Sequence, residues 1–409
     1  MGCDMPTMRF YLFDDRRARR WAPFTLTRPA GELLYGCLSL RERAERALGL
    51  ECTAHVSRTV LVGFDEPGAA PAIAPRDLSP DGPLVLLSSR AALESAPVQL
   101  PTGPATLIVD RRVAGWILPD RESLASERWL KDPASASLGG ERVELPGRWL
   151  EHPWDLMAGN EERVARDIEE LWPVDASAPG ALRVGDHRLS LGEGAVVEPG
   201  VHLDLRDGPI RLAEGARVEG PARLTGPLYV GPGSTVLGGT VGTSSIGPVS
   251  LVRGEVAASI LLGYVNKAHD GHLGHAIVGR WVNLGAFTTN SDLKNNYRSV
   301  RVWTPEGEKD TGMLKVGCFF GDHVKTGIGT VINTGSVIGA GSNVYGGLMP
   351  PTVVPPFSWG AGSDYRDHRL DKFMETAEAV MARRGQELTP GVTEILRVAW
   401  TETAGRRAE

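Results

Sequence analysis

Cysteine is scarce in this sequence, and long apolar runs are absent. The four cysteines (Cys3, Cys37, Cys52 and Cys318) lie far apart without Cys-x-x-Cys spacing, which argues against a disulfide framework or a cysteine zinc site. No run of about 18 apolar residues occurs, and residues 1–10 lack a basic segment followed by an apolar one. We therefore expect a soluble, cytoplasmic protein without a membrane-spanning segment.

A strong excess of one charge is absent as well. Lysine and arginine total 44 against 50 acidic residues, a formal net charge of −6, so neither nucleic acid nor an anionic membrane is expected as the main partner. Lysine itself is rare, with 7 residues, and so is asparagine, with 8. Five of these lysines, seven of these asparagines and four of the nine histidines lie between residues 266 and 343. We expect the functional site in this window.

Glycine, by contrast, is abundant and unevenly placed. It supplies 50 of 409 residues, and 34 of them lie between Gly180 and Gly362. In this stretch residues recur every six positions in two long runs: Leu212, Val218, Leu224, Val230 and Val236, then Phe320, Thr326, Ile332, Ile338 and Val344. Neither a helix nor an alternating strand has this period. It predicts a parallel β-helix in which three hexads form one coil and residues 18 apart stack.

The period is lost from about residue 263 to 278 and again from 288 to 314, and we interpret both stretches as loops that leave the coil. The repeat resembles the left-handed parallel β-helix of the hexapeptide-repeat acyltransferases. That family usually forms trimers, so the resemblance implies a homotrimer.

We expect three regions in the chain: an α/β domain at 1–175, the β-helix at 180–362 and a helical tail at 363–409. Apolar runs predict strands, and helical spacing predicts helices. The expected strands are Met8–Phe13, Val60–Phe64, Leu84–Leu87 and Thr106–Val109; the expected helices are Glu32–Leu48, Trp154–Leu171, Asp364–Arg384 and Val392–Thr403.

The segment Asn266-Lys-Ala-His-Asp-Gly-His-Leu-Gly-His275 lies in the first of these two stretches. Amide formation needs a base that takes a proton from the attacking amine, and an imidazole titrates in the right range. His269 is the candidate base. The spacing of His269, His272 and His275 also suggests a zinc site. Three histidines on one loop, however, do not match the tetrahedral arrangement of zinc ligands from neighbouring coils.

This segment resembles the acetyltransferase half of the bifunctional glucosamine-1-phosphate acetyltransferase/N-acetylglucosamine-1-phosphate uridyltransferase family. The resemblance implies acetyl transfer from acetyl-CoA to an amino sugar phosphate, with His269 as the catalytic base. It further implies an acetyl-CoA contact at Ala286 and substrate contacts at Lys267, His272, Asn283, Asn296 and Tyr297.

The segment Arg20-Trp-Ala-Pro-Phe-Thr-Leu-Thr-Arg-Pro29 resembles the signature of sugar-1-phosphate nucleotidyltransferases. The resemblance implies uridylyl transfer from UTP with Mg²⁺, with Arg20 and Arg28 near the phosphates and Asp110 and Asp155 as metal ligands. That class binds the triphosphate on a glycine-rich turn after the first strand. Here residues 14–20 contain no glycine.

Other interpretations stay open. The glycine-free turn favours an N-terminal domain that binds a sugar nucleotide without turnover, and the β-helix could act on a different amino sugar nucleotide. Asp110 and Asp155 could equally be a strand-end and a helix N-cap residue, and the two arginines could be solvated.

Overall fold

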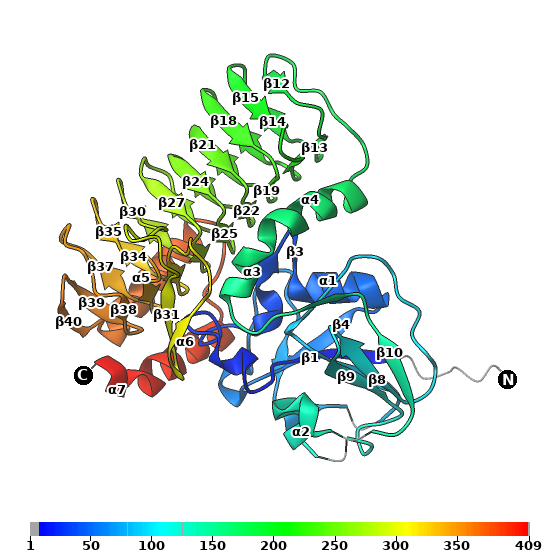
Figure 1. Cartoon of the computed structure of the whole chain (residues 1–409). Coiled ribbons are helices and arrows are strands. Elements are labelled where there is room, and N and C mark those ends of the chain that lie inside the picture. The colour runs from blue at the N-terminus through cyan, green and yellow to red at the C-terminus, as the bar shows by residue number, and fades with distance from the viewer. Residues whose placement is uncertain (1–7, 80, 125, 137, 408–409) are drawn as a thin grey trace.

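The computed structural model describes residues 8–79, 81–124, 126–136 and 138–407 and shows two parts that lie side by side (Figure 1). The N-terminal part, blue to cyan in the figure, is built on one seven-stranded sheet. The second part, green to orange, is a long stack of coils. Helix α4 (Asn160–Leu171) leads from the first part along the start of the second.

The seven-stranded sheet has the order β10-β8-β9-β6-β1-β4-β5. Strand β9 is antiparallel to both of its neighbours, and the other pairs are parallel. The strands of this part are β1 (Arg9–Phe13), β2 (Leu34–Tyr35), β3 (Leu38–Ser39), β4 (Cys52–Val56), β5 (Ala72–Ile73), β6 (Leu84–Ser88), β7 (Ala91–Leu93), β8 (Ala105–Val109), β9 (Arg112–Leu118), β10 (Glu141–Glu144) and β11 (Gly147–Trp149), and the helices before α4 are α1 (Leu40–Leu48), α2 (Arg128–Lys131) and α3 (Trp154–Ala158).

Two predictions for this part are wrong in detail. Residues Val60–Phe64 form no strand, because a 3₁₀ turn occupies Thr59–Leu61. The first helix begins only at Leu40, where the Ser39 hydroxyl accepts a hydrogen bond from the Glu42 amide and the Glu42 carboxylate accepts one from the Ser39 amide. The strands expected at the start of the chain, near residue 85 and near residue 107 are present.

The coils form a three-sided parallel β-helix, which confirms the predicted architecture. The first side contains β12 (Leu182–Val184), β15 (Val201–Asp204), β18 (Ala222–Thr225), β21 (Gly239–Gly242), β24 (Glu255–Ala257) and β27 (His272–Gly274). The second side contains β13 (Leu189–Leu191), β16 (Ile210–Leu212), β19 (Leu228–Val230), β22 (Ser245–Ile246), β25 (Ile260–Leu261), β28 (Ile277–Val278), β33 (Phe319–Phe320), β36 (Val337–Ile338) and β38 (Val353–Val354). The third side contains β14 (Val196–Val197), β17 (Arg217–Val218), β20 (Thr235–Val236), β23 (Leu251–Val252), β26 (Asn266–Lys267), β29 (Asn283–Leu284), β34 (Lys325–Thr326), β37 (Asn343–Val344), β39 (Ser358–Ala361) and the antiparallel β40 (Asp364–Asp367).

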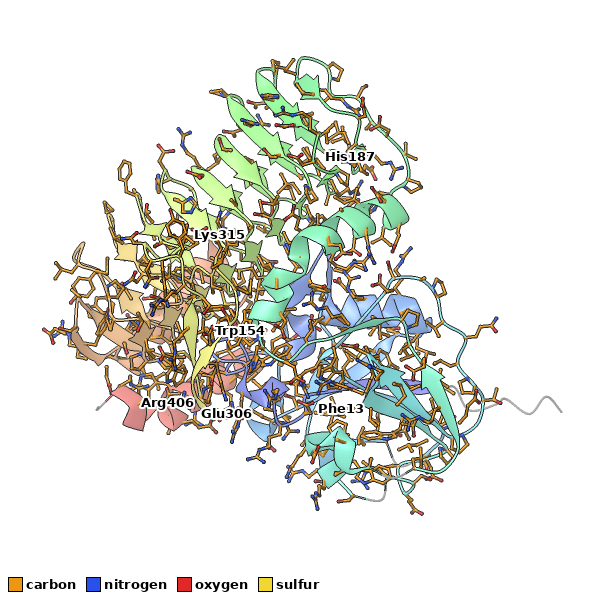
Figure 2. All side chains as sticks on the ribbon, in the orientation of Figure 1. Phe13, Trp154, His187, Glu306, Lys315 and Arg406 are labelled. Carbon is orange, nitrogen blue, oxygen red and sulfur yellow. The ribbon has the colours of Figure 1, made fainter. Side chains whose placement is uncertain are left out.

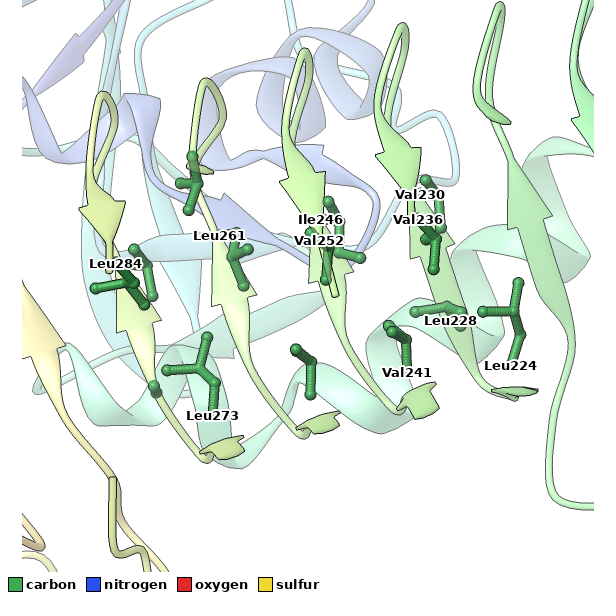
Figure 3. Packing of buried hydrophobic residues seen from close by; sticks show 14 of the residues in the cluster. Leu224, Leu228, Val230, Val236, Val241, Ile246, Val252, Leu261, Leu273 and Leu284 are labelled. Carbon is green, nitrogen blue, oxygen red and sulfur yellow. The ribbon is translucent and has the colours of Figure 1, made fainter. Parts of the chain in front are cut away.

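The interior of the β-helix is a continuous apolar column, part of which Figure 3 shows. The predicted stacking is confirmed, since Val218 is paired with Val236 and Phe320 with Ile338. Almost every strand turns one or two apolar side chains inward, so successive coils bury one another.

From β25 onward the second side is apolar on both faces, which explains doublets such as Ile277-Val278 and Phe319-Phe320. One residue of each doublet faces the column, and the other packs against the N-terminal part, where Trp21, Phe24 and Trp154 cover it. A strand buried on both faces needs consecutive apolar residues. The N-terminal part therefore sits on this side as a fixed cover.

The predicted loop at 263–278 is wrong. The coil continues through β26, β27 and β28, and the period is hidden because Lys267 occupies an inward position. The second interruption is real. After β30 (Thr289–Asn290), which pairs with β35 (Val331–Ile332), residues 291–317 leave the coil as an insertion loop. This loop contains the antiparallel hairpin of β31 (Arg301–Thr304) and β32 (Gly307–Asp310).

Three helices end the chain: α5 (Leu370–Ala382), α6 (Pro390–Glu402) and α7 (Ala404–Arg407). Helix α5 packs Phe373 on Phe357 near the last coil, and α6 packs Ile395 on Leu61 of the N-terminal part. Within the ranges that the structure describes, no helix has the length and apolar character needed to cross a membrane.

A buried ionic cluster fastens the two parts together. Asp322, on the β-helix, accepts hydrogen bonds from the Thr27 hydroxyl at 2.7 Å, the Arg28 guanidinium at 3.0 Å and the Arg280 backbone amide at 2.8 Å. Glu66 pairs with both Arg28, at 2.8 Å, and the Arg280 side chain, at 2.9 Å. Burial alone would raise the pKa of Glu66, but the two arginines lower it. The charges therefore compensate one another.

The variant Asp322→Asn tests this cluster. Removing one carboxylate leaves the buried Arg28 guanidinium with incomplete compensation, and we expect a loss of about 3–5 kcal/mol in unfolding free energy. Urea unfolding followed by fluorescence measures it, with exposed Asp186→Asn as the control. Equal stability of the two variants would show that the cluster does not hold the parts together.

Candidate functional site

His269 lies at the corner between β26 and β27 and is exposed to solvent. The corner is tight because Gly271 adopts a φ of 130°, and the Phe287 amide of the next coil donates to the carbonyl of Asp270 at 2.8 Å. The Asp270 carboxylate pairs with Arg253 at 3.1 Å. The corner thus presents the imidazole on a rigid, hydrogen-bonded backbone.

Lys267 is buried within the coil, although we expected it to contact substrate. Its side chain is 1% exposed, and its ammonium donates to the carbonyl of Arg253 at 2.9 Å and to the carbonyl of His269. Burial lowers the pKa of Lys267 to about 8. Lys267 therefore holds the backbone that carries His269.

His272 and His275 share one carboxylate, that of Asp292 at the start of the insertion loop. The imidazole Nδ1 of His275 lies 2.7 Å from Asp292, and His272 lies 3.9 Å from Asp292 and 3.3 Å from Glu255. The nearby Asp292 carboxylate raises the pKa of His272, and the two histidines hold the pKa of Asp292 well below its usual range. Neither histidine shares its corner with His269.

Asn283 lies on the outer face of the third side, one coil after Asn266. The Asn266 amide nitrogen donates to the Asn283 amide oxygen at 2.9 Å, and the two strands are in register at this pair. Ala286 follows at the next corner, where its carbonyl accepts from the Gly329 amide at 2.8 Å. Asn266, Asn283 and His269 therefore lie on neighbouring coils of one side and its corner.

Asn296 and Tyr297 lie on the insertion loop, both exposed, away from that side. Tyr297 lines a cleft of about 500 Å³ together with His275, Lys315 and, from α4, Glu161. Within one chain the structure therefore places Tyr297 beside His275 and not beside His269.

The hairpin of the insertion loop reaches the N-terminal part. Its tip residue Glu306 pairs with Arg20 at 2.8 Å, and Figure 2 labels Glu306 at this boundary. Arg20, expected near phosphates, is thus paired with the β-helix, while Arg28 is fully buried between Glu66 and Asp322. With its guanidinium nitrogens bonded to these carboxylates, Arg28 has a structural role here.

The turn after β1 is filled by its own carboxylates, which sequence reasoning missed. The Asp15 carboxylate accepts hydrogen bonds from the backbone amides of Arg17, at 3.0 Å, and Ala18, at 2.9 Å, and pairs with Arg90 at 2.8 Å. The Asp14 carboxylate accepts hydrogen bonds from the hydroxyls of Ser57 and Ser89 and from the backbone amide of Ala30. Asp14 and Asp15 stand in the turn where the resembled class has glycine, and this pair of carboxylates was the sequence feature that could have predicted the arrangement.

A basic cleft of about 720 Å³ lies beside this turn, and its lining contains both charges: Arg16, Arg17, Arg90, Arg111, Arg112 and Lys131, and the acidic Asp15, Asp132, Glu151 and Glu306. Glu151 pairs with three of these arginines, while Arg16 and Arg111 form no ion pair within the described residues. It lies at the carboxyl end of β1, where ligands of open α/β sheets commonly bind. Cationic side chains can therefore attract an anion here, although the turn's own amides are occupied.

The two aspartates expected to bind Mg²⁺ do not fit that role. Asp110 is exposed in the two-residue turn between β8 and β9, with a φ of 48°. Asp155 lies in the first turn of α3, after the N-cap residue Pro153, and accepts hydrogen bonds from the amides of Glu151, at 2.7 Å, and His152, at 2.9 Å, so it holds the turn before the helix and is not its N-cap. The described part of the chain contains no group of three or more metal-ligating side chains.

Comparison with known proteins confirms the resemblance of both parts. Residues 10–172 match the family described as sugar nucleotidyl transferase. A bifunctional sugar-1-phosphate nucleotidylyltransferase/acetyltransferase of Sulfurisphaera tokodaii is 32% identical over 95 residues, which cover 23% of this chain and 24% of that protein. The bifunctional protein GlmU of Methanocaldococcus jannaschii is 27% identical over 241 residues, covering 56% of this chain and 52% of that protein. The chain thus spans between a quarter and a half of these relatives.

Among solved structures, the N-acyltransferase AntD of Bacillus cereus is 16% identical, with a TM-score of 0.25 over 47% of this chain and 91% of that one. The UDP-N-acetylglucosamine acyltransferase of Campylobacter jejuni is 13% identical, with a TM-score of 0.23 over 54% and 94%. At these TM-scores the structures support no inference about this chain.

The variant Asp292→Asn tests the shared carboxylate. Because the pKa of His272 is raised in the fold, its ion pair stabilises the protein below about pH 6.5 and loses this effect as the pH rises through the folded pKa. We expect the variant to be less stable than the wild type by about 1 kcal/mol near pH 6, with a smaller difference near pH 8.5. Urea unfolding at both pH values measures this, with exposed Asp207→Asn as the control. A larger difference at the higher pH would contradict the assignment.

Proposed function

We propose that the β-helix transfers an acetyl group from acetyl-CoA to the amine of glucosamine-1-phosphate. The observation that carries this proposal is the exposed His269 imidazole on a corner whose backbone is held by the buried Lys267 ammonium. The polar pair of Asn266 and Asn283 lies on the same side. The match to bifunctional relatives named for nucleotidylyl and acetyl transfer supports this choice of reaction.

In the proposed reaction the amine nitrogen of the sugar attacks the thioester carbonyl of acetyl-CoA, and His269 takes one proton from this amine. The new C–N bond forms, the C–S bond breaks, and the CoA thiolate leaves and takes up a proton. A base that titrates near neutral pH suits this transfer. Asn283 binds the sugar, Ala286 lies at the acetyl-CoA contact, and Asn296 and Tyr297 contact the acceptor from a second copy in the proposed homotrimer.

The match over residues 10–172 extends the proposal to the N-terminal part. There a linked reaction would join N-acetylglucosamine-1-phosphate to the uridylyl group of UTP and release pyrophosphate. The basic cleft beside the first turn supports an anionic ligand of this kind.

A second candidate function is favoured by the filled turn. Because Asp15 occupies the amides of Arg17 and Ala18, these amides are not free for a triphosphate. In this alternative the N-terminal part binds a sugar nucleotide without turnover. A third alternative, acyl transfer to another amino sugar nucleotide, differs only in the acceptor.

The variant His269→Ala tests the proposed base. Loss of general-base catalysis lowers kcat by about 10²–10⁴-fold, and the KM for acetyl-CoA stays close to that of the wild type. Thiol release from acetyl-CoA with glucosamine-1-phosphate as acceptor measures both. His187→Ala, at another exposed position of the β-helix, is the matched control. Full activity of His269→Ala would rule out this residue as the base.

Pyrophosphate release separates the two functions of the N-terminal part. The linked reaction predicts pyrophosphate from UTP plus N-acetylglucosamine-1-phosphate, dependent on both substrates. Binding of UDP-N-acetylglucosamine by calorimetry without pyrophosphate above background would instead establish the second candidate.

A further inference from the structure

A groove of about 250 Å³ lies between the third side of the β-helix and the C-terminal end of α5. Its lining includes Asn266, Asn283 and Trp281 from the coils and Arg383 and Arg384 from the end of α5. These segments are about a hundred residues apart in the sequence, so no motif indicates the groove.

The charge of the groove is positive. Arg383 is exposed and Arg384 is half-buried, and within the described residues neither guanidinium forms an ion pair. Most other arginines at the surface of this protein pair with a carboxylate, as Arg397 does with Glu394. Two neighbouring guanidinium groups that face a cavity without acidic lining are suited to a phosphate, which they can bind through several charge-assisted hydrogen bonds.

The floor of the groove is suited to sugar hydroxyls. The bond between the Asn266 nitrogen and the Asn283 oxygen leaves the Asn266 oxygen and the Asn283 nitrogen available as an acceptor and a donor. A hydroxyl group both donates and accepts, so it can bridge these two atoms. The register of β26 and β29 fixes the spacing of the two side chains.

An aromatic pair forms one wall. Trp281 and Tyr264 stack with their ring centroids 4.1 Å apart, and the Arg280 guanidinium lies 4.8 Å from the Tyr264 ring centroid. Both rings are nearly buried and therefore rigid. Trp281 also stacks with His323, so the pair gives the groove a rigid wall without an open ring face.

We propose that this groove binds the acceptor of the acetyl transfer, with Arg383 and Arg384 on its phosphate and Asn266 and Asn283 on its sugar hydroxyls. The inference rests on the proposed function and names the part of the chain that selects a phosphorylated acceptor. His269 follows Asn266 by three residues, at most about 11 Å of extended chain, on the same coil. A sugar held by the asparagine pair would thus have its amine within reach of the corner that carries the imidazole.

The double variant Arg383→Gln/Arg384→Gln tests the phosphate contact in the full-length chain. We expect the KM for glucosamine-1-phosphate to rise about tenfold or more, with the KM for glucosamine and for acetyl-CoA unchanged. The Arg→Lys pair should restore part of the loss, because it keeps the charge but not the planar donors. Lys372→Gln, which removes a cation from α5 outside the groove, is the matched control.

Calorimetry with glucosamine-1-phosphate alone gives a readout without turnover, and we expect binding to weaken by the same factor in the double variant only. If the wild type acetylates no amino sugar, the proposed function fails, and this binding comparison still decides the groove. An unchanged KM and Kd would overturn the inference while the function stands. A loss confined to acetyl-CoA, or shared equally by glucosamine, would also overturn it.

Discussion

The arrangement of this protein depends on one carboxylate, that of Asp322. It receives the Thr27 hydroxyl and the Arg28 guanidinium from the N-terminal part and the Arg280 amide from its own coil. A buried charge with partners from two parts of the chain tolerates little relative movement, because every displaced partner would leave an uncompensated group. This cluster and the apolar doublets of the second side seat the N-terminal part on the β-helix.

The β-helix then determines where chemistry can occur. The inward side chains of the strands fill the interior column, so functional groups can lie only at outward positions and at the corners. His269 is at a corner, and the asparagine pair is at outward positions of the third side. Lys267 is an exception, since it occupies an inward position, and its ammonium donates to the backbone carbonyl of His269. The filled turn after β1 uses carboxylates in a similar way, to satisfy backbone groups that lack a partner.

Much of this fold could be predicted from the sequence, because the hexad period records one inward residue per strand and the stacking of Val218 on Val236 follows from it. The continuation of the coil at 263–278 could not, since a lysine whose stem lies inside and whose ammonium is bonded to carbonyls has no apolar signature. The role of Arg28 was equally hidden. A Thr-Arg-Pro segment suggests phosphate, and only the fold brings Asp322, almost 300 positions later, against it. The groove under α5 is a tertiary feature of the same kind, and the histidines could be listed from the sequence but not assigned to separate corners.

We propose that this β-helix acetylates a phosphorylated amino sugar. The most direct measurement is thiol release from acetyl-CoA by the full-length protein, across a panel that contains glucosamine-1-phosphate, glucosamine, glucosamine-6-phosphate and amino sugar nucleotides. We expect the highest kcat/KM for glucosamine-1-phosphate, with formation of its N-acetyl product. No acceptor-dependent thiol release with any member of the panel would contradict it.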